Sequence, residues 1–119
     1  MLADITRADS IYIVCGKTDM RKQIDGLCSI IEKKLHMGPN DNALFLFCGR
    51  RSGRIKCLIF EGDGYCLLYK RLVPGFRYQW PRTAQEVKEL TPQQFNELMK
   101  GFNPLQKGLI GEVPPERVG

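Results

Sequence analysis

Hydrophobic and polar positions along the first third of the chain follow two different periods. A β-branched apolar run that ends in glycine, SIYIVCG at 10–16, predicts a first strand. Apolar residues then recur at helical spacing over 20–35, after Thr18 and Asp19, which are both favourable helix caps. We therefore expect a helix that starts at Thr18 or Asp19 and ends before Gly38.

The middle of the chain contains four runs of strand length, each rich in aromatic and aliphatic residues. The linkers GRRSG, EGDG and VPG have the composition of tight turns, and linkers this short cannot form parallel crossovers. The pattern therefore predicts antiparallel hairpins, with the run ALFLFC as a central strand because it is apolar on both faces. The four predicted strands cover residues 43–48, 54–60, 65–72 and 76–80.

A second helix is predicted near the C-terminus from LTPQQFNELMKGF, where Thr91 is the cap, Pro92 the first helical residue and Gln94 the partner in a capping box. From residue 103 on, proline and glycine are scattered without any period. We expect an α+β fold over 1–102, an antiparallel meander sheet of about five strands with one helix after the first strand and a second near the C-terminus. An irregular tail follows over 103–119.

Composition restricts the class of protein further. A chain of 119 residues with 43% apolar and 26% charged residues fits one soluble domain. No apolar run is long enough to cross a membrane and the N-terminus has no basic leader, so we expect a cytoplasmic location without membrane contact. The five cysteines form no CxxC pair and His36 is the only histidine, which favours buried reduced thiols over a zinc site. We expect no metal and no cofactor.

The positive charge is concentrated in one third of the chain. The formal net charge is +5, but residues 49–82 carry eight basic and two acidic residues, and the rest of the chain has a net charge of −1. Six of the eight basic residues are arginines, which bind phosphate with two parallel hydrogen bonds. Lysines and arginines also protect sheet edges from aggregation, but the asymmetry favours a nucleic acid or another anionic surface as the partner.

Aromatic residues are interleaved with this positive charge, a mixture that nucleic-acid surfaces use for base stacking. The alternative is that the aromatic side chains fill the core, because residues 76, 78 and 80 share one face of a strand. We expect Phe76 and Trp80 to lie in the core and leave Tyr78 open. The aromatic residues concerned are Tyr65, Tyr69, Phe76, Tyr78 and Trp80.

Candidate catalytic groups are few. His36 lies near a predicted helix end, where a solvated histidine is common. Glu61 and Asp63 in EGDG have carboxylates that suit a hard cation, but the same four residues are typical of a hairpin turn. There is no phosphate-binding loop or dinucleotide fingerprint, so we identify no catalytic residue.

Arg21 and Lys22 follow the predicted helix cap, where two cations oppose the helix dipole. An external anionic partner or a salt bridge to Asp19 or Asp25 would each explain them, and the sequence does not separate the two.

Three stretches of the chain together resemble a known family. TDMRKQIDGL, LFLFCGRRSGRIKCLIFEGDGYCLLYKRL and FRYQWP are similar, in order and spacing, to the TnpB accessory proteins of the bacterial insertion-sequence family numbered 66, products of its second reading frame. The resemblance covers residues 10 to 102. It implies a small protein that acts beside a separate, larger transposase, without established catalytic residues. The RNA-guided nucleases that share the name TnpB are a different, much longer group.

Three functions follow as hypotheses. The first is a non-enzymatic accessory factor for DNA transposition that binds DNA at transposon ends. The second is a protein–protein interaction module that docks on the transposase, and the third is a metal-dependent nuclease that uses Glu61 and Asp63. Since Arg21 and Lys22 lie in a stretch that carries the resemblance, we favour a ligand-facing role for them. The predicted nucleic-acid-binding residues are Arg21, Lys22, Arg50, Arg51, Arg54, Lys56, Lys70, Arg71 and Arg77.

Overall fold

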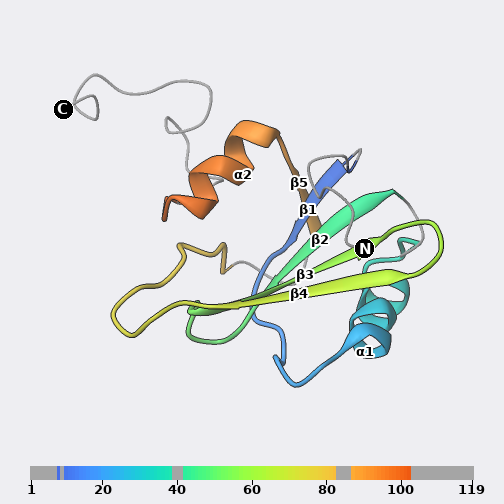
Figure 1. The fold of residues 1–119 in the computed structure, drawn as a ribbon, viewed down its shortest axis with the longest axis horizontal. Helices are drawn as coiled ribbons and strands as arrows, with labels where there is room; N and C mark the ends of the chain where they lie inside the picture. Colours follow the sequence, from blue (N-terminus) through green and yellow to red (C-terminus); the bar gives the residue numbers. More distant parts are fainter. Residues whose placement is uncertain (1–7, 9, 39–41, 83–86, 103–119) are drawn as a thin grey trace.

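The protein is built around one five-stranded sheet, seen in a computed structural model that describes residues 8, 10–38, 42–82 and 87–102 (Figure 1). The strands lie in the spatial order β4-β3-β2-β1-β5. Their bounds are β1 Ser10–Val14, β2 Ala43–Cys48, β3 Arg54–Phe60, β4 Tyr65–Arg71 and β5 Val87–Leu90. The helices are α1 Ile24–Ser29, which continues directly into the π-helix η2 Ile30–Lys34, and α2 Pro92–Met99. The predicted α+β class is confirmed.

The sheet is mixed, so the prediction of a purely antiparallel meander is wrong. β2–β3 and β3–β4 are antiparallel hairpins as predicted, and β1–β5 is also antiparallel. β1 and β2 are parallel, with Ile11 opposite Leu44. Short linkers enforce antiparallel pairing only within 43–72, because the connection from β1 to β2 contains a helix and is long enough for a parallel crossover.

The predicted strand at 76–80 is absent, and in its place an irregular segment crosses one face of the sheet. The backbone N–H of Tyr78 donates to Ser52 O at 2.7 Å, and the Trp80 indole N–H donates to Val14 O at 2.9 Å. The Tyr78 and Trp80 side chains are buried, but Phe76 is 68% exposed, contrary to the expectation that it packs in the core. The fifth strand is instead β5.

The first helix starts later than predicted. The backbone N–H of Thr18 donates to Cys48 O at 2.7 Å, and the Thr18 side chain is buried rather than capping a helix. The chain then turns, and α1 begins at Ile24 without a side-chain cap. The second helix agrees with its prediction, because Thr91 Oγ1 accepts from Gln94 N and the Gln94 side chain accepts from Thr91 N. The predicted tail over 103–119 lies outside the described residues.

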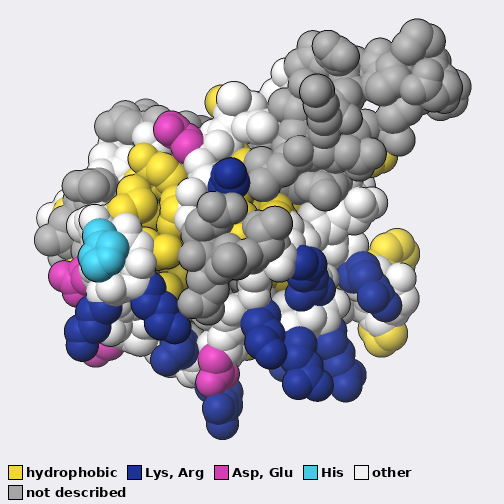
Figure 2. Space-filling view, turned by 180° about the vertical axis from the view of Figure 1, so that it is seen from behind, with side chains coloured by type: hydrophobic (Ala, Val, Ile, Leu, Met, Phe, Trp, Pro, Cys, Tyr) yellow, Lys and Arg dark blue, Asp and Glu magenta, His cyan; other side chains and the backbone are white. Residues whose placement is uncertain are grey.

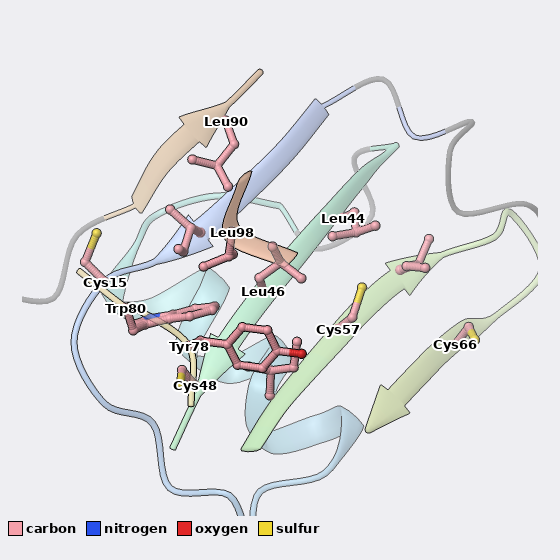
Figure 3. Close-up of a cluster of buried hydrophobic side chains, with 13 residues drawn as sticks. Cys15, Leu44, Leu46, Cys48, Cys57, Cys66, Tyr78, Trp80, Leu90 and Leu98 are labelled. Atoms are coloured by element: carbon pink, nitrogen blue, oxygen red, sulfur yellow. The ribbon is translucent and has the colours of Figure 1, made fainter. Parts of the chain in front are cut away.

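Apolar side chains pack on both faces of the sheet. On one face, α1 and η2 cover a cluster that includes Leu27, Ile31, Phe45 and Leu58. On the other face, segment 76–82 and α2 cover a second cluster, and Figure 3 shows the Tyr78 and Trp80 rings lying over the strands there. Every residue of β2 is buried, which confirms it as the central strand. Four cysteines are buried in these clusters or beside them, and Cys28 is partly buried.

Candidate nucleic-acid interface

Most of the predicted binding residues meet at one end of the sheet, where β2 ends, β3 begins and β4 ends. We call this region the basic end and define it as residues 19–22, 49–54 and 70–77. Hydrogen bonds of the main chain hold its parts together. Leu72 N–H donates to Gly53 O at 2.8 Å, which places the chain after β4 against the β2–β3 hairpin. Dark-blue side chains gather along the lower edge of the molecule in Figure 2.

The β2–β3 hairpin is a tight, well-anchored turn. Gly49 N–H donates to Arg54 O at 2.9 Å, and Ser52 N–H donates to Gly49 O at 3.1 Å. Ser52 is buried and has a φ of 60°, and its hydroxyl accepts a hydrogen bond from Arg82 Nη2. The fixed backbone leaves three exposed arginine side chains at the surface of the hairpin: Arg50, Arg51 and Arg54.

Two arginines face each other across neighbouring strands. Arg54 on β3 pairs in register with Arg71 on β4, and both side chains are exposed. Residues directly opposite in an antiparallel pair have Cβ atoms about 5 Å apart, and like charges there are destabilising. In the described part of the chain, neither guanidinium group has a hydrogen bond or an ion pair. This pair concentrates positive charge without any internal compensation.

Lys70 and Arg77 extend the basic end along the other side of β4. The Lys70 ammonium lies 5.9 Å from the centre of the Tyr78 ring, a distance at which a cation–π attraction operates. Both Lys70 and Arg77 are exposed. Their charges therefore remain accessible beside the hairpin.

Segment 19–22 packs beside the hairpin, as the close contact between Met20 Cγ and Gly49 shows: a Cβ on Gly49 would lie 2.8 Å from that atom. Arg21 forms a salt bridge with Asp19 at 2.9 Å, and its backbone N–H also donates to that carboxylate. These hydrogen bonds from Arg21 lower the pKa of Asp19 to about 2. Of the two explanations for Arg21, the salt bridge to Asp19 is present, and the Lys22 side chain is exposed.

Lys56 differs from the other predicted binding residues. It is 5% exposed, its ammonium donates to Lys22 O at 2.7 Å, and it lies 5.7 Å from the centre of the Tyr69 ring. The alternation of charged and apolar residues in β3 indicated an exposed lysine, but segment 19–22 covers it. Lys56 connects β3 to that segment and does not lie on the surface of the basic end.

The acidic turn lies at the opposite end of β3 and β4. Glu61 N–H donates to Gly64 O at 2.7 Å and Gly62 has a φ of 91°, so the EGDG residues form the hairpin turn. With about 3.3 Å per residue, the seven residues of β3 separate this turn from the hairpin arginines by roughly 20 Å. Among the residues described, no group of three or more His, Cys, Asp or Glu side chains is placed to hold a metal ion.

The model of the family described as "IS66 Orf2 like protein" matches residues 9–108. The chain belongs to the IS66 Orf2-like family. This confirms the resemblance stated above, and the matched residues contain the whole basic end. Membership associates the protein with the transposition of insertion sequences.

Two relatives of this IS66 Orf2-like protein come from Sinorhizobium fredii (strain NBRC 101917 / NGR234). "Uncharacterized protein y4hO" is 33% identical over 93 residues, which cover 78% of this chain and 80% of the relative. "Uncharacterized protein y4jC" is 24% identical over 98 residues, which cover 82% of this chain and 83% of the relative. No solved structure matches the chain.

Two features of the basic end were not predicted from the sequence. Arg82 supports the hairpin through Ser52, which only the fold reveals, because thirty positions separate the two residues. The exposed Phe76 was assigned to the core, although the VPG turn before it could have indicated a projecting loop.

No helix among the described residues is long and apolar enough to span a membrane.

Proposed function

We propose that this IS66 Orf2-like protein is a non-enzymatic accessory factor for DNA transposition and binds nucleic acid through the basic end. In this proposal the phosphate contacts come from exposed side chains of the hairpin, β4 and the following loop. These residues are Arg50, Arg51, Arg54, Lys70, Arg71 and Arg77. Arg21 and Lys22 flank them, and the Asp19 carboxylate competes for Arg21.

The observation that carries the proposal is the cross-strand pair of Arg54 and Arg71. A sheet gains nothing from two uncompensated cations at facing positions, because opposite charges there would stabilise it and like charges destabilise it. A bound phosphate removes the repulsion by accepting hydrogen bonds from both guanidinium groups. The pair is therefore better explained by an external anion than by stability.

The remaining arrangement also favours a polyanion. The hairpin backbone is fixed by Ser52 and its side-chain contact to Arg82, so binding does not have to order the loop. Acidic side chains of the β3–β4 turn lie at the far end of the strands. Cations outnumber the one acidic residue of the basic end, Asp19, and this excess of positive charge steers an anionic partner toward it.

The test is the salt dependence of binding to transposon-end duplex, unrelated duplex and single strand. For the triple variant Arg50→Ala, Arg51→Ala and Arg54→Ala, we expect nearly unchanged thermal stability, because exposed substitutions change stability by about 0.5 kcal/mol or less each. We expect the log–log salt slope to shrink by about 0.9 per lost contact. The control triple Lys33→Ala, Lys34→Ala and Lys100→Ala removes the same charge from exposed positions on η2 and after α2.

The outcomes separate the hypotheses. Equal loss of binding in the two triple variants would mean that net charge alone matters and would contradict the proposal. Affinity for the transposase without affinity for any nucleic acid would favour the docking module. Magnesium-dependent cleavage that is lost in a Glu61→Ala/Asp63→Ala variant would favour the nuclease, and we expect no cleavage.

A further inference from the structure

The basic end carries exposed apolar side chains as well as charges. The large hydrophobic residues that are exposed in the described chain are Tyr69 (52%), Val73 (63%) and Phe76 (68%). Single exposed apolar residues are ordinary when they are scattered over a surface. Val73 and Phe76 lie in the basic end, in the loop after β4, whereas Tyr69 precedes them on β4 with its ring 5.7 Å from the Lys56 ammonium. Two exposed apolar residues, Val73 and Phe76, between the exposed Arg71 and Arg77 favour a partner that offers both charged and apolar groups.

The loop that presents Phe76 contains a hydrogen-bonded turn. Phe76 N–H donates to Val73 O at 3.2 Å, Pro74 occupies the second position, and Gly75 has a φ of 96°, which together define a type II turn. Apart from Gly75 itself and its two chain neighbours, no described residue comes within 4 Å of the position that a Cβ on Gly75 would take, so the turn projects into open space. On either side, Leu72 and Tyr78 are bonded to the hairpin backbone. Phe76 is therefore presented by a hydrogen-bonded turn whose two flanks are bonded to the hairpin backbone.

The Phe76 backbone also lies directly beside the arginine hairpin. A Cβ on Gly53 would lie 3.9 Å from the carbonyl oxygen of Phe76, and Gly53 immediately precedes Arg54. Arg77 follows Phe76 in the chain and is exposed. The segment that carries the exposed Phe76 ring thus lies against the arginine hairpin and continues directly into an exposed arginine.

We propose that Phe76 stacks on an unpaired base, so that the basic end prefers single-stranded or locally unpaired DNA to perfect duplex. This inference rests on the proposed nucleic-acid binding and identifies the form of DNA that the same site takes. Bases in a perfect duplex are already stacked, whereas an unpaired base offers its face to an aromatic side chain. An acidic protein surface would pair with the arginines but would offer no flat apolar face to the Phe76 ring.

The experiment compares wild type, Phe76→Ala, Phe76→Leu and Phe76→Trp on a labelled mixed-sequence single strand, the matching duplex, and that duplex with a short unpaired bulge. We expect Phe76→Ala to weaken binding to the single strand and the bulge by roughly 5- to 150-fold, the equivalent of one base stack. The perfect duplex should be affected much less. Phe76→Leu should behave like Phe76→Ala, because leucine keeps apolar area but has no ring.

Phe76→Trp supplies a second readout that does not depend on affinity. It should keep the single-strand preference, and the emission of the new exposed tryptophan should be quenched when a base stacks on it, whereas Trp80 is buried. Val73→Ala is the control for lost apolar surface at the same tip and should change the preference little. Since Phe76 is exposed, all these variants should fold, which thermal melting checks.

Three other results would each contradict the stacking role of Phe76, and they can be told apart. If Phe76→Ala keeps the wild-type affinities for all three DNAs while the salt slope persists, phosphate binding stands and stacking is wrong. If Phe76→Ala loses only binding to the transposase, the tip is a protein contact and stacking is equally wrong. If wild type binds none of the three DNAs at low salt, both the proposed function and the stacking role are overturned.

Discussion

Lys56 and Arg54 lie two residues apart on the same face of β3, and we predict opposite consequences when each is replaced by alanine. Lys56→Ala removes a charge-assisted hydrogen bond to Lys22 O, worth about 1.5–3 kcal/mol. It also removes three buried methylene groups beyond Cβ, at about 0.8 kcal/mol each. The variant no longer has to desolvate an ammonium group, which offsets part of that loss. We expect the free energy of unfolding to fall by about 2–3 kcal/mol.

Arg54→Ala is the matched control, because its side chain is exposed and faces the like charge of Arg71. Its free energy of unfolding should change by about 0.5 kcal/mol or less. Urea unfolding followed by the fluorescence of Trp80, the single tryptophan, measures both variants, since Trp80 moves from a buried to an exposed site. Under native conditions, Arg54→Ala should reduce the salt slope of DNA binding by about 0.9, and Lys56→Ala should leave it unchanged.

A Lys56→Ala variant that keeps wild-type stability and reduces the salt slope of DNA binding would contradict this prediction. That result would return Lys56 to the binding surface. An Arg54→Ala variant that unfolds at a much lower urea concentration than wild type would also contradict it, because the hairpin arginine would then be structural.

Three further predictions concern other parts of the molecule. Arg21 lowers the pKa of Asp19 to about 2, so the stabilisation from this pair should be present above pH 3.8 and lost as the pH falls toward 2. An NMR titration of the Asp19 carboxylate should have its midpoint near pH 2, and Arg21→Gln should raise that midpoint. Asp19→Asn should also tighten DNA binding by releasing Arg21. At pH 8 a thiol reagent should modify the partly buried Cys28 first and Cys57 only after unfolding, because burial raises the pKa of Cys57 to about 12. Labelling of Cys57 in the folded protein would contradict the fold. Thr91→Ala should cost about 1 kcal/mol by removing the cap of α2, and Thr91→Ser should cost much less; equal losses would mean that the cap bond is not what matters.

Local patterns predicted the elements whose environment is set by their own residues. The run ALFLFC is apolar on both faces and becomes the buried central strand β2. The capping box around Thr91 specifies the start of α2 through contacts three residues apart. In β2 every side chain is buried, and in α2 the capping contacts join residues three positions apart. Both features can therefore be read from the local sequence alone.

Elements that depend on distant contacts were predicted wrongly. Thr18 has a good capping side chain, but its backbone N–H bonds to Cys48 O, and α1 begins only after a turn. The alternation in FRYQW predicted a strand, but residues 76–80 form none: Ser52 O accepts the N–H of Tyr78, and the segment pairs with none of the described strands. β5 was not predicted, because a strand of only four residues, two of them the exposed Lys88 and Glu89, has no recognisable alternation of apolar and polar positions.

The candidate site was predicted in composition and only partly in position. The concentration of arginines in 49–82 located the basic end, because hairpin turns bring nearby segments together. The burial of Lys56 and the exposure of Phe76 depend on segment 19–22 and on the turn at Gly75, which the alternation of residues does not encode. The predicted domain boundary after residue 102 stays a prediction.

The most direct test of the central claim, that the basic end is the surface that binds DNA, is to map backbone amide chemical shifts of the labelled protein during titration with a short DNA. We predict that the amide signals of 49–54 and 70–77 move together, and that those of the EGDG turn at 61–64 and of α2 stay in place. The shifts should disappear at high salt, because phosphate contacts are screened and replaced by counterions. Shifts confined to α2 or to the EGDG turn, with the hairpin signals unmoved, would contradict the account.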